Sequence, residues 1–191
     1  MRELADKGLS VKAVLTDLYP NLPAFARVSS AHRELIELRS EPVDATNVPA
    51  SLDGLRVMFN AFHHFKPELA TAVLQDAAAK KQPIAIFEVV SREALSLVGM
   101  FLSPLNFALS VPFLRPFQWS WLLFTYVVPV LPAFVLWDGL VSWLRIYSEA
   151  ELCELTSRIE TPPGWTWDMG RIRLGNAPAH ATYLIGLPPK Q

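Results

Sequence analysis

Two long stretches without a charged residue constrain this 191-residue chain more than any other feature. Residues 94–114 contain no Asp, Glu, Lys or Arg, and after the lone Arg115 the next charged residue is Asp138. Each stretch has about the 20 residues that a helix needs to cross a bilayer. An apolar surface of this size is covered by a membrane, by a ligand or by another protein. We expect membrane contact through residues 95–144, with an apolar lid over a substrate pocket or a homodimer surface as the alternatives.

Five prolines in these stretches argue against two simple spanning helices, because proline kinks or breaks a helix. They are Pro104, Pro112, Pro116, Pro129 and Pro132. The stretches are also rich in tryptophan and tyrosine, which prefer the headgroup level of a membrane. With Arg92 and Arg145 flanking it, the segment is expected to form a hairpin that dips into or crosses the membrane and returns to the cytoplasmic side.

The charge balance predicts no nucleic-acid partner. The chain has 17 Lys and Arg against 18 Asp and Glu, for a net charge of -1, so it lacks the basic surface that nucleic acids require. Cys153 is the only cysteine, which excludes an internal disulfide and agrees with a reducing compartment. The charged first residues do not resemble a secretory signal. We therefore expect a cytoplasmic, membrane-associated protein.

Outside the apolar stretches, the hydrophobic pattern predicts an α/β fold. Strands are expected at residues 11–15, 35–38, 55–65 and 84–90, with a short helix starting near 29–34 and a longer one from Pro67 to Lys81. This spacing of βαβ units favours a mainly parallel sheet covered by helices. A capped helix from Ser148 and an antiparallel strand pair at 165–174 and 181–187 complete the pattern. We predict one domain over residues 1–191, with residues 92–146 as an apolar helical insertion.

Candidate functional residues follow the predicted strands. Open α/β sheets bind ligands at the carboxyl ends of their strands, and the strand at 55–65 ends in polar and aromatic residues around His63 and His64. Asp17, after the first strand, could accept hydrogen bonds from ribose hydroxyls or could serve only as a turn residue. Asp44 follows the second strand in a loop. Either histidine could act as a base or orient a substrate, and either could equally be a packing residue.

Several kinds of site are excluded or disfavoured by the sequence. His63 and His64 would point to opposite faces of a strand unless the strand has already ended before them, and no second cluster of metal-ligating residues accompanies them, so no metal site is predicted. The chain has no Gly-x-Ser-x-Gly nucleophile motif. It also has no Gly-x-Gly turn for a phosphate group, which disfavours a nicotinamide-dependent oxidoreductase.

Four segments, in their order, resemble the second to fifth strands of class I S-adenosylmethionine-dependent methyltransferases. They are residues 15–21 (Leu-Thr-Asp-Leu-Tyr-Pro-Asn), 42–45 (Pro-Val-Asp-Ala), 58–65 (Met-Phe-Asn-Ala-Phe-His-His-Phe) and 86–88 (Ile-Phe-Glu). The closing strand pair is similar to the sixth and seventh strands of that family. The resemblance implies a Rossmann-like methyltransferase sheet and S-adenosylmethionine as the cofactor.

The resemblance also implies roles for individual residues. Asp17 would hold the ribose hydroxyls of the cofactor, and Asp44 with Ala45 would lie against its adenine. Four residues would follow the segment that resembles the fourth strand of the family, and they would face the methionine end of the cofactor and the methyl acceptor: Asn60, Ala61, Phe62 and His63. His63 or His64 would remove the acceptor's proton. Methyl transfer needs little beyond alignment of an acceptor lone pair with the methyl group.

The sequence departs from the family at its start. Family members begin with a strand and a glycine-rich turn that wraps the methionine part of the cofactor, and this sequence begins after that point. We expect an incomplete sheet in a truncated or degenerate relative that binds the cofactor weakly or not at all. The favoured function is a methyltransferase for an apolar, small-molecule or lipid-like acceptor. The alternative is a non-enzymatic, membrane-associated protein with a Rossmann-like scaffold.

Overall fold

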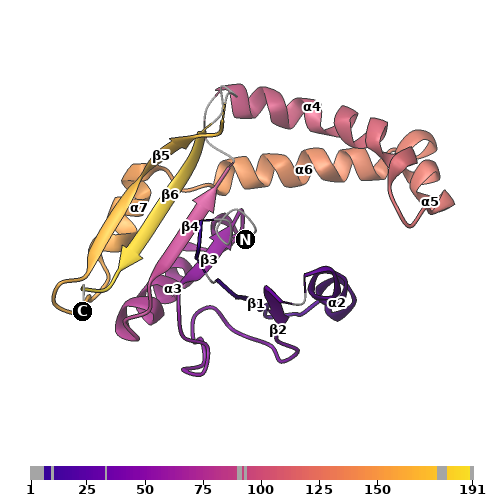
Figure 1. Cartoon of the computed structure of the whole chain (residues 1–191). Coiled ribbons are helices and arrows are strands. Elements are labelled where there is room, and N and C mark those ends of the chain that lie inside the picture. Colours follow the sequence, from indigo (N-terminus) through magenta and orange to yellow (C-terminus); the bar gives the residue numbers. More distant parts are fainter. Residues whose placement is uncertain are drawn as a thin grey trace. The chain divides into compact units, whose positions relative to one another are not determined.

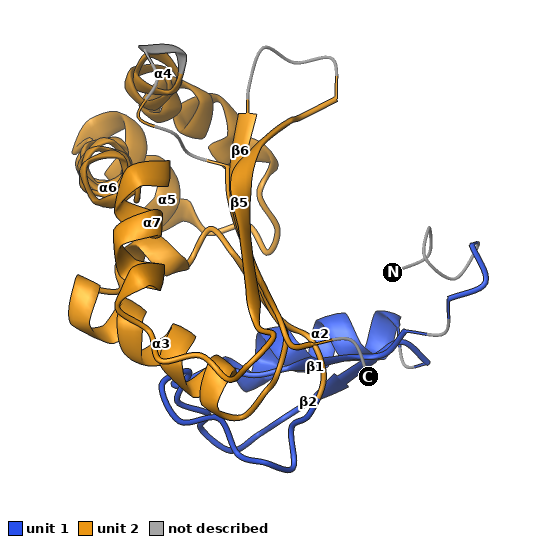
Figure 2. Ribbon diagram, turned by 90° about the vertical axis from the view of Figure 1, so that its left-hand side faces the viewer, with its two compact units in different colours: residues 1–53 blue, residues 54–191 orange. Residues whose placement is uncertain are grey.

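The computed structural model describes residues 7–9, 11–32, 34–89, 92, 94–175 and 180–189. They form a mixed α/β structure, which confirms the predicted fold class at this level. The chain divides into two compact units, Met1–Asp53 and Gly54–Gln191, which are described separately below (Figure 2). The prediction of one domain over residues 1–191 stays a prediction.

The first unit contains two short parallel strands and a helix. The strands β1 (Ala13–Leu15) and β2 (Ile36–Leu38) pair in parallel, with Ala13 opposite Ile36. Between them lies α2 (Leu22–Ala31), which begins where the Asn21 side chain accepts a hydrogen bond from the Ala24 amide at 3.1 Å. Both strands confirm the prediction from sequence. The helix predicted to start near 29–34 is misplaced, because α2 begins at Leu22 and has only its last three residues, 29–31, in that range.

The second unit is built on a four-stranded sheet with the order β3-β4-β6-β5. Its strands are β3 (Arg56–Phe59), β4 (Ile84–Glu88), β5 (Thr166–Arg173) and β6 (His180–Leu187). The pair β3–β4 is parallel, whereas β6 is antiparallel to both β4 and β5. The antiparallel pair therefore forms one edge of the sheet, as the sequence predicts. The other edge is β3, whose outer side pairs with no other strand within the described part of the unit.

Two helices of the second unit, α3 (Pro67–Ala79) and α7 (Glu149–Ser157), lie on the same side of this sheet (Figure 2). The core is apolar: Leu74 on α3, Ile84 and Ile86 on β4, and Leu184 on β6 are almost fully buried. Both helix starts have the residues that the sequence predicts. Pro67 opens α3, and α7 carries a capping box between Ser148 and Glu151.

The apolar insertion forms a long helical hairpin (Figure 1). Its elements are α4 (Ala94–Ser110), η2 (Val111–Phe113), α5 (Trp119–Leu122), η3 (Leu123–Val127) and α6 (Val130–Arg145). Most of the prolines lie at the ends of these elements, where a missing amide hydrogen is tolerated; Pro104 lies inside α4. The residues predicted as an insertion at 92–146 thus form this hairpin, whereas their being an insertion within a single domain stays a prediction; Arg92 and Arg145, at the two ends of the hairpin, line the pocket of the candidate site.

Candidate functional site

The site begins where β3 ends. The predicted strand at 55–65 is too long, because β3 stops at Phe59 and Asn60 takes a left-handed conformation with φ 49°. The Asn60 amide donates to the Phe87 carbonyl at 2.9 Å, and its side-chain oxygen accepts from the Val89 amide at 2.7 Å. Asn60 therefore ties the carboxyl end of β3 to that of β4, and its short polar side chain tolerates the left-handed backbone.

After Asn60 the chain forms the short 3-10 helix η1 (Phe62–His64), which places His63 against Glu88. His63 Nδ1 lies 2.6 Å from Glu88 Oε2, and both side chains are buried. The other carboxylate oxygen, Oε1, accepts the Phe62 amide at 2.7 Å and the His63 amide at 3.3 Å. With Glu88 ionised, Nδ1 must carry the proton, so the lone pair of a neutral His63 is on Nε2.

His64 is in a different environment. It is exposed, and its ring centroid lies 4.2 Å from that of His63. The strand has already ended before the two histidines, which lie on η1, so the expectation that they point to opposite faces of a strand does not apply. Even so, no group of three His, Cys, Asp or Glu side chains suited to a metal ion occurs within the residues that the structure describes.

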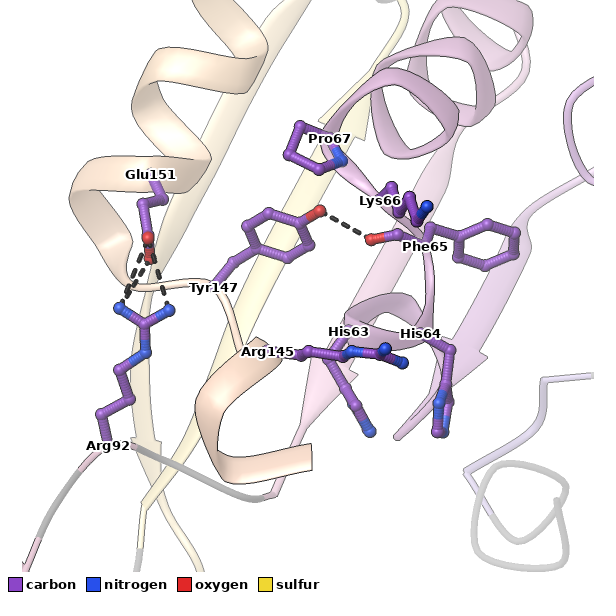
Figure 3. A pocket seen from close by; sticks show the side chains of 9 residues that line it. All are labelled: His63, His64, Phe65, Lys66, Pro67, Arg92, Arg145, Tyr147 and Glu151. Carbon is purple, nitrogen blue, oxygen red and sulfur yellow. Dashed lines mark hydrogen bonds and ion pairs between the residues drawn. The ribbon is translucent and has the colours of Figure 1, made fainter. Parts of the chain in front are cut away.

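The two histidines line a pocket of about 220 Å³ between η1 and the base of the hairpin (Figure 3). Its lining consists of His63, His64, Phe65, Lys66, Pro67, Arg92, Arg145, Tyr147 and Glu151. Drug-sized ligands generally occupy about 300–1,000 Å³. The pocket is therefore suited to one reacting group or headgroup rather than to a whole nucleoside.

Tyr147 and Glu151 connect α7 to this pocket. The Tyr147 hydroxyl donates to the Phe65 carbonyl at 2.7 Å, and its ring packs on Phe62 with centroids 5.5 Å apart. Burial, followed by the negative charges of Glu151 and Glu68, raises the pKa of the Tyr147 hydroxyl above its ordinary value of 10.0. Tyr147 therefore stays protonated at neutral pH and keeps donating this hydrogen bond.

Glu151 is held ionised by its neighbours. Burial raises the pKa of its carboxyl, but hydrogen bonds from Ser148 and the nearby Arg92 outweigh burial and hold that pKa below the ordinary value of 4.5. The closest Arg92–Glu151 contact is 3.2 Å between Nη1 and Oε2. By contrast, Lys66 and Arg145 form no ion pair with any carboxylate in the described part of the chain. The pocket thus has two cationic side chains available to an anionic group.

The acidic residues predicted to hold a cofactor lie in the first unit, apart in the chain from the histidines. Asp17 and Asp44 are both exposed turn residues. Asp17 Oδ1 accepts the Tyr19 amide at 2.7 Å, and Asp44 Oδ1 accepts the Thr46 amide at 2.8 Å. The Asp17 carbonyl also accepts the Val43 amide at 2.9 Å, which brings the two turns together. Ala45, next to Asp44, is half-buried.

The predicted residues of the second unit are clustered. Asn60, Ala61, Phe62 and His63 are consecutive and follow β3. Reasoning from sequence missed their main partner, Glu88, although a carboxylate inside an otherwise apolar strand was a visible signal. It also missed Tyr147 and the pocket roles of Arg92 and Arg145, which no local pattern reveals.

No protein-family profile matches the chain. No curated protein matches it significantly either. Solved structures do share its fold. A pericyclic reaction enzyme superposes with a TM-score of 0.52 at 14% identity, LepI in complex with SAM with 0.51 at 14%, and a LepI variant with SAH and a substrate analogue with 0.50 at 15%. Each match covers 97% of this chain but 39% of the other, so the chain spans about two-fifths of these proteins.

Proposed function

We propose that this chain belongs to an S-adenosylmethionine-dependent methyltransferase that acts on an apolar or membrane-resident acceptor, with His63 as the general base. The observation that carries the proposal is the buried His63–Glu88 pair beside a pocket at the carboxyl ends of β3 and β4. A histidine oriented by a carboxylate is a common device for removing a proton from a reacting group.

The fold and its neighbours support the cofactor. Within the second unit, the antiparallel pair β5–β6 follows the parallel strands, in keeping with the likeness of the closing strand pair to the last two strands of the family. Two of the solved neighbours are complexes, one with SAM and one with SAH. A pericyclic reaction is not a methyl transfer, so the neighbours support only the binding of S-adenosylmethionine. Support for methyl transfer therefore comes from the pocket.

The residues present fit the adenosine part of this cofactor. Asp17 is exposed, and its second carboxylate oxygen has no hydrogen-bond partner within the described residues, so it can accept from ribose hydroxyls. Asp44 and Ala45, in the same unit as Asp17, would lie against the adenine. The cofactor would supply the methyl group. The 191 residues contain no Gly-x-Gly turn, so other residues must hold its methionine part.

His63 would take up the proton that the acceptor loses. An acceptor hydroxyl or amine in the pocket would donate to Nε2, and its proton would pass there as the new bond to carbon forms. The imidazolium that results would be stabilised by Glu88, which already accepts from Nδ1. General-base catalysis of this kind contributes about 10²–10⁴-fold to a rate. Lys66 and Arg145 would hold an anionic group of the acceptor.

Binding and turnover of the full-length protein test this proposal separately. Calorimetry should detect S-adenosylmethionine binding that Asp17→Asn weakens. With labelled S-adenosylmethionine and a total lipid extract, His63→Gln should lose methyl transfer about 10²-fold or more while keeping cofactor binding.

The matched control is His64→Gln, because among the described residues Glu88 pairs with His63 and no carboxylate pairs with His64. Failure of the wild-type protein to bind S-adenosylmethionine would overturn the proposal. Binding without any methyl transfer would overturn the reaction but leave a cofactor-binding enzyme of another kind. Full turnover by His63→Gln would show that His63 is not the general base.

A further inference from the structure

The hairpin is two helices packed side by side. The arms α4 and α6 lie along each other, and η2, α5 and η3 close the far end, here called the tip (Figure 1). The arms approach closely at Gly139, where an added Cβ would lie 2.9 Å from Met100 Cγ. The two arms therefore pack on each other. As a whole, the hairpin extends away from the sheet of its own unit (Figure 1).

Large apolar side chains cover the outside of the hairpin. Phe101 on α4 is 61% exposed, Phe113 81%, Trp119 78% and Phe134 on α6 66%. Many others are exposed along both arms and the tip, including Val98, Leu102, Leu105, Leu109, Leu123, Val127, Val130, Trp137 and Leu144. Soluble monomers rarely expose apolar patches larger than a few hundred Å². This surface therefore requires an apolar environment.

The dimensions of the hairpin suit a bilayer. The 17 residues of α4 are about 25 Å long at 1.5 Å per residue, and the three residues of η2 add about 6 Å, close to the ~30 Å of a hydrocarbon core. The segment Ser96–Phe113 has a mean hydropathy of 1.5 and is long enough to span. The return path, Trp119–Val127 with Val130–Arg145, meets the same criteria together and is bent by 75°.

Charged and aromatic residues are arranged as at membrane interfaces. Between Ala94 and Leu144 the only charged residues are Arg115, at the tip, and Asp138. Asp138 lies seven residues before Arg145, about 10 Å along the helix from the base, so it is the one carboxylate of the hairpin that insertion would place below the headgroup layer. Arg92 and Arg145 flank the hairpin at its base; Arg92 pairs with Glu151, and Arg145, which pairs with no described carboxylate, is complementary to anionic lipid headgroups.

Most of the tryptophan and tyrosine residues of the hairpin and its flanks lie near its two ends. Trp143 and Tyr147 lie at the base, Trp119, Trp121 and Tyr126 lie at the tip, and Trp137 alone lies midway along α6. These residue types prefer the interface between headgroups and hydrocarbon. Two aromatic layers separated by an apolar length of about one hydrocarbon core are what an inserted hairpin requires.

We propose that the α4–α6 hairpin is inserted into a lipid bilayer, with Arg92 and Arg145 at the headgroup level. Because both arginines line the pocket of His63, insertion places this pocket at the membrane surface. If the proposed function holds, the methyl acceptor is an amphiphile taken from the bilayer, and Lys66 and Arg145 hold its anionic group. This identification of the acceptor rests on the proposed function. The insertion itself rests only on the hairpin.

Flotation with vesicles tests the insertion. Full-length protein purified in detergent is mixed with phosphatidylcholine vesicles containing phosphatidylglycerol, and the detergent is removed. The wild-type protein should float with the vesicles and resist both high salt and alkaline carbonate. The double variant Phe101→Asp/Phe134→Asp should partition into the vesicles at least about a hundredfold less, because an aspartate within the hydrocarbon-buried part of a helix is strongly disfavoured.

Leu69→Asp is the matched control, since Leu69 on α3 is 50% exposed but lies off the hairpin. It should float like the wild type, and circular dichroism should show all proteins folded. A wild-type protein that stays a soluble monomer without detergent would overturn the proposal in favour of a lid. A soluble dimer that shields Phe101 and Phe134 would overturn it in favour of a second copy. Calorimetry on the floated protein keeps failure of cofactor binding distinct from failure of insertion.

Discussion

Replacing Glu88 separates its structural role from its role in orienting His63. In Glu88→Ala, the backbone amides of Phe62 and His63 lose their acceptor inside a buried site. Each buried unsatisfied donor costs about 1–3 kcal/mol, so the two together lower the free energy of unfolding by about 2–6 kcal/mol. The longer 3.3 Å contact of the His63 amide favours the lower half of that range.

Glu88→Gln should preserve the fold and change the histidine. The amide oxygen can still accept from the Phe62 amide, so the expected loss of stability is only about 1 kcal/mol. The amide nitrogen, however, donates hydrogen bonds and faces His63 Nδ1, which must then become the acceptor. The proton moves to Nε2, and His63 loses the lone pair with which it would act as a base.

Two measurements check this prediction without any assay of activity. Chemical denaturation gives the free energies of unfolding, with Glu154→Gln as the control because Glu154 pairs with Arg158 on an exposed helix face. Nitrogen-15 NMR of the His63 ring reports which nitrogen carries the proton. Stability of Glu88→Ala within 1 kcal/mol of the wild type, or a Glu88→Gln variant that keeps the proton on Nδ1, would refute the reasoning.

Two further predictions concern packing and pH. Gly186→Ala should lower the free energy of unfolding by about 1–3 kcal/mol in a denaturation experiment, because its Cβ would lie 2.4 Å from Trp167 Cζ3 and 2.8 Å from Trp165 Cζ2. The control Gly99→Ala has open space and should not destabilise. Since the pKa of Glu151 is lowered by folding, its contribution is present above about pH 4.5 and is lost as pH falls through the folded pKa. Its side chain is 41% exposed, so Glu151→Gln should remove less than about 1 kcal/mol of acid-dependent stability in denaturation curves at pH 7 and pH 3.5.

The parts of the fold that the sequence predicted correctly depend on local signals. Pro67 at a helix start and the capping box of Ser148 and Glu151 act within one turn, so neighbouring residues suffice to identify them. The short helix predicted at 29–34 was misplaced for a related reason. Asn21, which caps α2, carries the same kind of local signal, but the prediction gave it too little weight.

The sequence predicted some residues of the site but not the contacts between them, because those contacts join residues far apart in the chain. His63 and Asn60 could be proposed from their position after a strand. The partner of His63 is Glu88, 25 residues away, and the oxygen of Asn60 bonds an amide 29 residues away. A single sequence contains no pattern that pairs such residues. The end of β3 at Phe59 depends on the same contacts, so the strand length was overestimated.

The two ends of the insertion contribute residues to the candidate site, so the insertion and the site are not separate parts of this unit. Arg92 precedes the hairpin and Arg145 ends it, and both line the pocket of His63. Two residues beyond the hairpin, Tyr147 packs on Phe62 and donates to the carbonyl of Phe65. The turn that carries His63 and the base of the hairpin are therefore held in one arrangement. If the hairpin lies in a membrane, the orientation of the pocket relative to the lipid surface is fixed by the fold, and an acceptor can reach His63 from the headgroup layer.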